Sequence, residues 1–261
     1  MTASETADLR SECDLLRSLH RPGDPLLLPN AWDAATARAV VAAGFPVVAT
    51  TSGGIAATLG YEDHEGAPGE EMLAAAARIA RGVEVPVTVD AEAGYGMEPA
   101  ELVAVLRTMG AAGCILEDSD YAAGSLRDPE RHARWLADVR RAASKDGYGL
   151  VVNARVDVFL AGFLAGVGPG TQEKLVGDAV LRANAYLEAG ADCVYPIALW
   201  EADPLRGFMS AVGGPVNVIR LPQAPSLAEL ASLGVARISW ATLLYRDAIA
   251  RFEEQLASLL D

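Results

Sequence analysis

The feature that most constrains the fold is a regular alternation of short β-branched runs with longer, alanine-rich amphipathic stretches along the whole chain. Nearly apolar runs separated by helices are typical of a parallel sheet that is covered on both faces. We expect eight strands, at residues 26–29, 47–50, 87–90, 114–117, 150–153, 193–196, 216–219 and 237–239. Eight such units predict an α/β fold, a (β/α)8 barrel of the TIM type, as a single domain over residues 1–261.

The expected helices lie between these strands, with one extra helix before the first strand and one after the last. Their ranges are 5–19, 34–43, 70–81, 99–109, 129–143, 172–189, 204–212, 227–233 and 241–260. Glycine follows several of them where a helix ends with a positive φ, as at Gly44, Gly110, Gly190 and Gly234. The open dinucleotide-binding sheet is the alternative, but it requires G-x-G-x-x-G after the first strand, and this chain has Asn30-Ala31-Trp32-Asp33 there.

Charge and cysteine content exclude several classes of function. The formal net charge is −14, and an acidic chain is repelled by phosphate backbones and anionic lipid, so we expect no nucleic acid and no membrane as partner. No apolar run reaches the ~18–20 residues that cross a bilayer, and the polar start does not resemble a signal peptide. Cys13, Cys114 and Cys193 are far apart, which argues against a disulfide framework and predicts a cytoplasmic location.

Acidic side chains collect at the ends of the third and fourth expected strands, the edge at which barrel enzymes place their active sites. Asp90 and Glu92 are two residues apart and point the same way, and Glu117-Asp118 ends the next strand. Carboxylates that converge without lysine stay ionised only when a cation lies among them. Oxygen ligands alone select a hard ion, Mg²⁺ or Mn²⁺. The alternative is that each carboxylate caps a helix or faces solvent.

Candidate anion-binding groups follow neighbouring strands. Arg155 ends the fifth strand and suits a substrate carboxylate or a developing enolate oxygen, and an ion pair with Glu117 or Asp157 is compatible with that role. Further candidates are the amides of Ser52-Gly53-Gly54 after the second strand and Asn217 on the seventh. Bare amides beside glycine approach an anion closely, although a Gly-Gly pair is often an ordinary turn.

These motifs resemble those of the isocitrate lyase / phosphoenolpyruvate mutase superfamily, the phosphonomutases among them, along nearly the whole chain. The resemblance is carried by Pro29-Asn30-Ala31-Trp32-Asp33, Thr51-Ser52-Gly53-Gly54, Leu59-Gly60-Tyr61-Glu62-Asp63, Asp90-Ala91-Glu92-Ala93-Gly94-Tyr95-Gly96, Ile115-Leu116-Glu117-Asp118 and Asn153-Ala154-Arg155-Val156-Asp157.

The resemblance implies a site as well as a fold. It implies Mg²⁺ bound through Asp90, Glu92 and Glu117, partly by way of water, and chelated by a 2-oxo acid. The Ser52-Gly53-Gly54 amides would hold the substrate carboxylate, and Arg155 would contact the enolate side. Asp63 aligns with a loop aspartate tied to catalysis and metal. The last helix would swap onto a neighbouring subunit in a homo-oligomer, a dimer of dimers.

The chain also departs from the family in ways that bear on the reaction. Lyases of the family carry a lid cysteine that acts as acid and base, whereas residues 119–128 contain neither cysteine nor histidine. The lid lysine and asparagine of the phosphonate enzymes are absent too.

From the shared motifs we expect a phosphoenolpyruvate phosphonomutase-like enzyme that acts at C3 of a small 2-oxo acid or phosphonate through an enolpyruvate oxyanion. Asp63, Arg155 and Glu117 are the expected catalytic residues. The alternatives are a C–C lyase or oxaloacetate-type decarboxylase of the same superfamily, and a non-catalytic 2-oxo acid binding protein.

Overall fold

Two parallel sheets form the centre of the protein in a computed structural model that describes residues 3–145 and 147–259. One sheet has the strand order β2 (Asn30–Ala31), β3 (Val48–Thr50), β4 (Val87–Asp90), β5 (Gly113–Glu117), β8 (Val151–Val156) and β9 (Cys193–Pro196). The other has the order β1 (Leu26–Leu28), β11 (Arg237–Ser239) and β10 (Asn217–Ile219). A parallel bridge from Val194 to Val216 links the two sheets on one side, and Pro29 alone separates β1 from β2 on the other.

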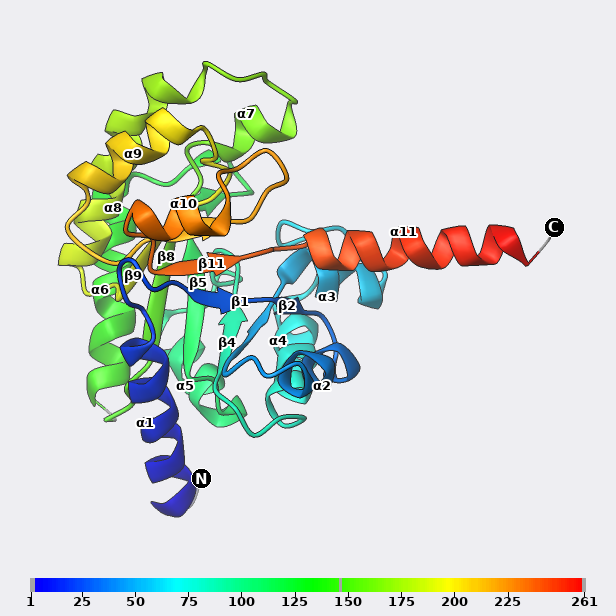
Figure 1. The fold of residues 1–261 in the computed structure, drawn as a ribbon. Coiled ribbons are helices and arrows are strands. Elements are labelled where there is room, and N and C mark those ends of the chain that lie inside the picture. Colours follow the sequence, from blue (N-terminus) through cyan, green and yellow to red (C-terminus); the bar gives the residue numbers. More distant parts are fainter. Residues whose placement is uncertain (1–2, 146, 260–261) are drawn as a thin grey trace.

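Helices surround the sheets (Figure 1). They are α1 (Ala3–Ser18), α2 (Ala34–Ala42), α3 (Ser52–Leu59), α4 (Gly69–Ala80), α5 (Pro99–Met109), α6 (Pro129–Lys145), α7 (Leu160–Leu164), α8 (Val176–Glu188), α9 (Ala202–Ala211), α10 (Leu227–Ser232) and α11 (Leu243–Ser258), with a 3-10 turn at Gln172–Leu175. Several pack side by side in chain order, from α4 through α5, α6 and α8 to α9. In contrast, α11 projects away from the body of the molecule (Figure 1).

The expected strands are all present, which confirms an α/β fold with parallel sheets. Proline splits the first of them because Pro29 has no N–H to donate to a neighbouring strand. Three features were not expected. Helix α3 begins directly at Ser52, α7 lies in a stretch that sequence analysis leaves as a loop, and β6 (Ser119–Asp120) pairs antiparallel with β7 (Ser125–Leu126). We refer to residues 119–126 as the lid hairpin.

Helix α1 packs against the amino ends of β5 and β8. Its buried residues include Cys13 and Leu16. A Cβ at Gly113 would lie 2.8 Å from Leu16 Cδ2, so glycine permits this close approach. The three cysteines are buried and unpaired in disulfides. Within residues 3–145 and 147–259, no helix has both the length and the apolar character to cross a membrane.

Candidate active site

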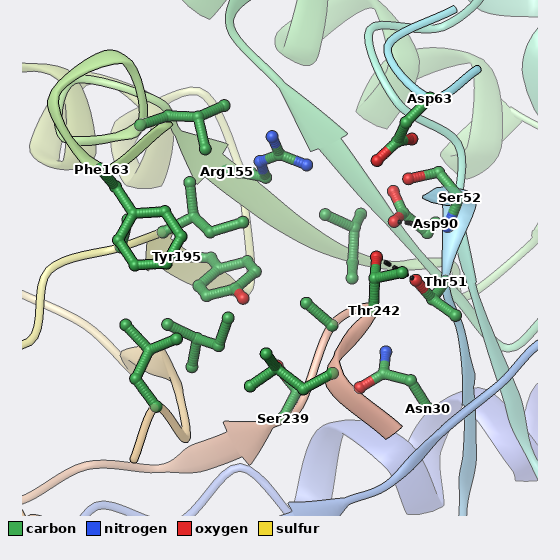
Figure 2. A pocket seen from close by; sticks show the side chains of 18 of the residues that line it. Asn30, Thr51, Ser52, Asp63, Asp90, Arg155, Phe163, Tyr195, Ser239 and Thr242 are labelled. Atoms are coloured by element: carbon green, nitrogen blue, oxygen red, sulfur yellow. Dashed lines mark hydrogen bonds between the residues drawn. The ribbon is translucent and has the colours of Figure 1, made fainter. Parts of the chain in front are cut away.

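A cavity of about 100 Å³ opens at the carboxyl ends of the strands. Its polar lining includes Asn30, Thr51, Ser52, Asp63, His64, Asp90 and Arg155. Its apolar lining includes Leu160, Phe163, Leu164, Ile197, Leu221 and Leu243. Figure 2 shows Asp63, Ser52 and Asp90 on one side of the cavity and Phe163 and Tyr195 on the other, with Arg155 between them. The cavity thus has a polar wall and an apolar wall.

Asp90 is fixed at the polar wall by backbone and side-chain contacts. The N–H of Ser52, the first residue of α3, donates to Asp90 Oδ2 at 3.0 Å, and the Asp90 N–H donates to Thr50 Oγ1 at 2.8 Å. Burial raises the pKa of the Asp90 carboxyl, and the positive charge of Arg155 partly opposes that shift. The expected amide donors therefore belong to a helix N-terminus, where orphan N–H groups favour negative charge.

Glycine at position 53 lets Asp63 approach this helix end. A Cβ there would lie 2.6 Å from Asp63 Oδ2 and 2.7 Å from Thr242 Oγ1. At Gly54 a Cβ would lie 2.7 Å from Thr51 Cγ2, so both glycines of the motif are required by packing. The other oxygen of Asp63, Oδ1, is buried and has no hydrogen-bond partner among the described residues.

Glu92 and Glu117 lie next to the cavity without lining it. The N–H of Glu65 donates to Glu92 Oε1 at 2.8 Å. Burial raises the pKa of Glu92 to about 7; the hydrogen bond from Glu65 opposes this shift, and the charges of Asp90 and Asp63 add to it. Glu117 is fully buried; it accepts a hydrogen bond from the Tyr121 hydroxyl and forms an ion pair with Arg155. Burial raises the pKa of Glu117, and the Arg155 charge opposes that shift.

Arg155 both faces the cavity and forms ion pairs, as its position at the end of a strand suggests. It lines the cavity, and it forms an ion pair with Glu117 and a two-pronged contact with Asp157, at 2.6 Å from Nε to Oδ1 and 3.2 Å from Nη2 to Oδ2. Such a fork holds the guanidinium plane in one orientation.

Asp118 serves a different purpose from Glu117, because consecutive strand residues face opposite sides. Its Oδ2 accepts from the Tyr186 hydroxyl at 2.7 Å and from Arg182 Nη1 at 3.0 Å, and its carbonyl accepts from the Arg127 N–H at 2.7 Å. Its Oδ1 accepts from the Asp157 N–H at 2.9 Å. Asp118 therefore anchors the base of the lid hairpin and the strand end that carries Arg155.

The carboxylates suit a hard divalent cation without forming a ready-made cage. In the described part of the chain, no three His, Cys, Asp or Glu side chains are arranged to hold a metal ion. Asp90 lines the cavity, whereas Glu92 accepts a hydrogen bond from the Glu65 N–H. Glu117 accepts a hydrogen bond from Tyr121 and forms an ion pair with Arg155. The donors are all oxygen, and a nearby cation would give the orphaned Asp63 oxygen a partner and would lower the raised pKa of Glu92.

Asn217 lies outside the cavity lining. It is fully buried; Asn153 Nδ2 donates to its Oδ1 at 2.9 Å, and its own Nδ2 lies 3.2 Å from Ser239 Oγ. The Asn217 side-chain amide is thus hydrogen-bonded to residues of neighbouring strands, among them the cavity residue Ser239.

Sequence reasoning missed the contact between the lid hairpin and the loop after α3. His64 Nδ1 lies 3.1 Å from the Tyr121 hydroxyl, and the two rings have centroids 5.2 Å apart. It also missed Phe163 and Thr242, which line the cavity from α7 and from just before α11. Tyr121 is the aromatic residue of the lid hairpin, which otherwise has small and acidic residues and one leucine, and this contrast could have identified it as a candidate site residue.

Comparisons with known proteins identify the family of this chain. The family model described as phosphoenolpyruvate phosphomutase matches residues 16–260. A solved Burkholderia cenocepacia J2315 structure assigned as a phosphonomutase is 41% identical with a TM-score of 0.86, and covers 96% of this chain and 99% of its own. A second structure from that organism, assigned as a lyase/mutase, is 32% identical with a TM-score of 0.84, over 97% and 89% of the two chains.

A Corynebacterium glutamicum protein assigned as 2-methylisocitrate lyase 1 is 31% identical over 89% of this chain and 76% of its own length. The neighbours share the fold, and the matched region contains every residue of the site described above. This chain is therefore a member of the phosphoenolpyruvate mutase/isocitrate lyase superfamily of mutases and lyases, and an enzyme of that group.

Proposed function

We propose that this enzyme acts at C3 of a small 2-oxo acid through an enolpyruvate oxyanion, with Mg²⁺ or Mn²⁺ as cofactor, in a phosphonomutase-like site. The observation that carries the proposal is the polar wall, where Asp90 and Asp63 meet a helix N-terminus beside Arg155 and the second Asp63 oxygen has no partner among the described residues. A divalent ion held there would polarise the 2-oxo group and balance the developing negative charge.

Asp90, Glu92 and Glu117 are the proposed metal ligands, directly or through water. Asp63 and Arg155, with Glu117, are the proposed catalytic residues. Arg155 is oriented by Asp157 and directed at the cavity, so its guanidinium is positioned for the enolate oxygen before the reaction begins. At the helix end that begins with Ser52, the amides of Gly53 and Gly54 would receive the substrate carboxylate, because the Ser52 N–H already donates to Asp90. Asn217 would support the site from beneath, through Ser239.

Cleavage of a C–C bond fits this cavity better than transfer of a phosphonyl group. Beside the proposed divalent ion, a phosphonate dianion would rely on cationic side chains, and those described in the lining are Arg155, which is already paired, and Arg246. The opposite wall is apolar, with Phe163 and Leu160 from the α7 segment. In a decarboxylation the C3–C4 bond breaks, its electron pair forms the enolate, carbon dioxide leaves, and C3 takes a proton.

Two assays distinguish the candidate reactions. Pyruvate release that depends on Mg²⁺, from oxaloacetate or from 2-methylmalate, supports the decarboxylase or the lyase. Interconversion of phosphonopyruvate and phosphoenolpyruvate, followed by phosphorus NMR, supports the mutase. Oxalate binding without turnover of any 2-oxo acid in a panel would instead indicate the non-catalytic binder. A panel screened by thermal stabilisation identifies the preferred ligand, because a ligand that binds only the folded state raises its melting temperature.

The architecture around the site belongs to the same proposal. We propose that the two sheets form one closed (β/α)8 barrel within a single domain, and that α11 covers a neighbouring subunit in a cytoplasmic dimer of dimers. Ile249, Phe252 and Leu256 on α11 are exposed, which supports a partner for this helix. Light scattering on wild-type protein and on Phe252→Glu tests the assembly, since the acidic variant is expected to dissociate.

A further inference from the structure

Arg237 is a charged side chain in the protein interior that the proposed mechanism does not use. It is 0% exposed, and none of its three guanidinium nitrogens has a hydrogen-bond partner among the described residues. Burial lowers the pKa of the Arg237 guanidinium, but arginine does not lose its proton in proteins, so the group remains a cation.

The other buried arginines of the protein differ from Arg237 in this respect. Arg155 is paired with Glu117 and Asp157, and Arg182 is paired with Asp118. A buried charge without a partner reduces stability, and an apolar residue of similar size is usually the more stable choice. Local violations of this rule are expected where they serve function.

Arg237 lies directly beneath the floor of the cavity. It is on β11, two residues before Ser239, so the two side chains share one face of the strand. Ser239 lines the cavity, as does Tyr195 of β9. Two residues of a strand span roughly 6.6 Å, so the Arg237 backbone is one inward-facing level below the cavity lining.

The charges around the cavity leave a role for this cation. Asp63 and Asp90 line the cavity and repel an anionic ligand unless the proposed divalent ion is bound. Arg155 is already balanced by Glu117 and Asp157, and the other arginine of the lining, Arg246, is exposed to solvent, which screens its charge. In a dry interior, where water does not screen it, an unpaired charge acts over several ångströms.

We propose that Arg237 is a fixed positive charge beneath the cavity floor that increases affinity for anionic ligands without touching them. The inference rests on the proposed function, because it assumes that a carboxylate-bearing ligand occupies this cavity. It assigns Arg237 an electrostatic role, so the size of its effect must follow the charge of the ligand.

The test compares Arg237→Met, which removes the charge, with Arg237→Lys, which keeps it. Affinity for oxalate, a dianion, and for pyruvate, a monoanion, is measured by calorimetry with Mg²⁺ present. We expect Arg237→Met to weaken oxalate binding about tenfold and pyruvate binding about threefold. Arg237→Lys should stay within about twofold of wild type, and the melting temperature of Arg237→Met should equal or exceed that of wild type.

Arg206→Met is the matched control, because Arg206 is exposed on α9 and forms an ion pair with Asp203. It should change neither affinity. Equal oxalate affinity in wild type and Arg237→Met overturns the inference, as does equal loss for oxalate and pyruvate, or failure of Arg237→Met to fold. Those results leave the proposed function intact. If wild type binds no oxalate with Mg²⁺, the proposed function falls and this inference falls with it.

Discussion

Two buried arginines, at successive levels of the strand interior, differ in whether their charge is paired. At the level of the cavity, Arg155 is bonded to Glu117 and Asp157. One level below, Arg237 has no partner among the described residues, and His20 Nε2 and Thr88 Oγ1 are also buried without one. Arg155 thus belongs to a paired network that fixes its geometry, whereas Arg237 is a cation without a hydrogen-bond partner whose field is available to the site. Pairing thus distinguishes charges that hold structure from a charge that can act on a ligand.

Removing the cation of the paired level should have the largest effect. Arg155→Met leaves Glu117 and Asp157 as buried carboxylates without a counter-ion. We expect the free energy of unfolding in urea to fall by about 3–5 kcal/mol. The variant that also carries Glu117→Gln and Asp157→Asn should recover most of this loss. A loss below about 1 kcal/mol in Arg155→Met would show that the pairs contribute little.

The lower level should make the protein sensitive to acid. Burial, and then the charge of Arg237, lower the pKa of His20 to about 4 from its ordinary value of 6.5. The folded state therefore binds fewer protons than the unfolded state between these values, and stability is lost as the pH falls from about 6.5 towards 4.

Between pH 7 and 4.5 the contribution of His20 to this loss is about 2–3 kcal/mol. Urea unfolding at the two pH values should show a smaller loss in His20→Leu than in wild type. NMR titration should find a higher pKa for His20 in Arg237→Met. An unchanged pKa would mean that the charge of Arg237 is compensated after all.

Ligand binding in the cavity should depend on the carboxylates that are the proposed metal ligands. We expect Asp90→Asn or Glu117→Gln to weaken Mg²⁺-dependent oxalate binding tenfold or more, which is about 1.4 kcal/mol. Calorimetry measures the affinity, and circular dichroism shows whether each variant is folded. A folded variant with wild-type affinity would exclude that residue from the metal site.

The apolar wall should give the smallest and most selective effect. Phe163→Ala should leave oxalate affinity unchanged, because Phe163 faces the polar wall from across the cavity (Figure 2). For a substrate with an apolar group at C3, kcat/KM should fall by a factor of about 5, or roughly 1 kcal/mol. Equal losses for substrates with and without that group would argue against an apolar subsite.

The sequence predicts the strands and much of the polar wall for a common physical reason. Buried parallel strands appear as apolar runs, and polar residues at their ends must meet at one edge, as Asp90 and Arg155 do. Partners are harder to predict, because a strand ending in Glu117-Asp118 does not reveal that one carboxylate faces Arg155 and the other Arg182. Arg237 gives no local signal, since its isolation depends on what other strands place around it.

The central claim is that a divalent ion and a 2-oxo acid meet at the polar wall. Crystals grown with Mn²⁺ and oxalate test it most directly, because Mn²⁺ is located by its anomalous scattering. The account predicts one strong peak among Asp90, Glu92 and Glu117, with oxalate between that peak and the amino end of α3. A Mn²⁺ peak elsewhere, or oxalate bound in the cavity without Mn²⁺, would contradict it.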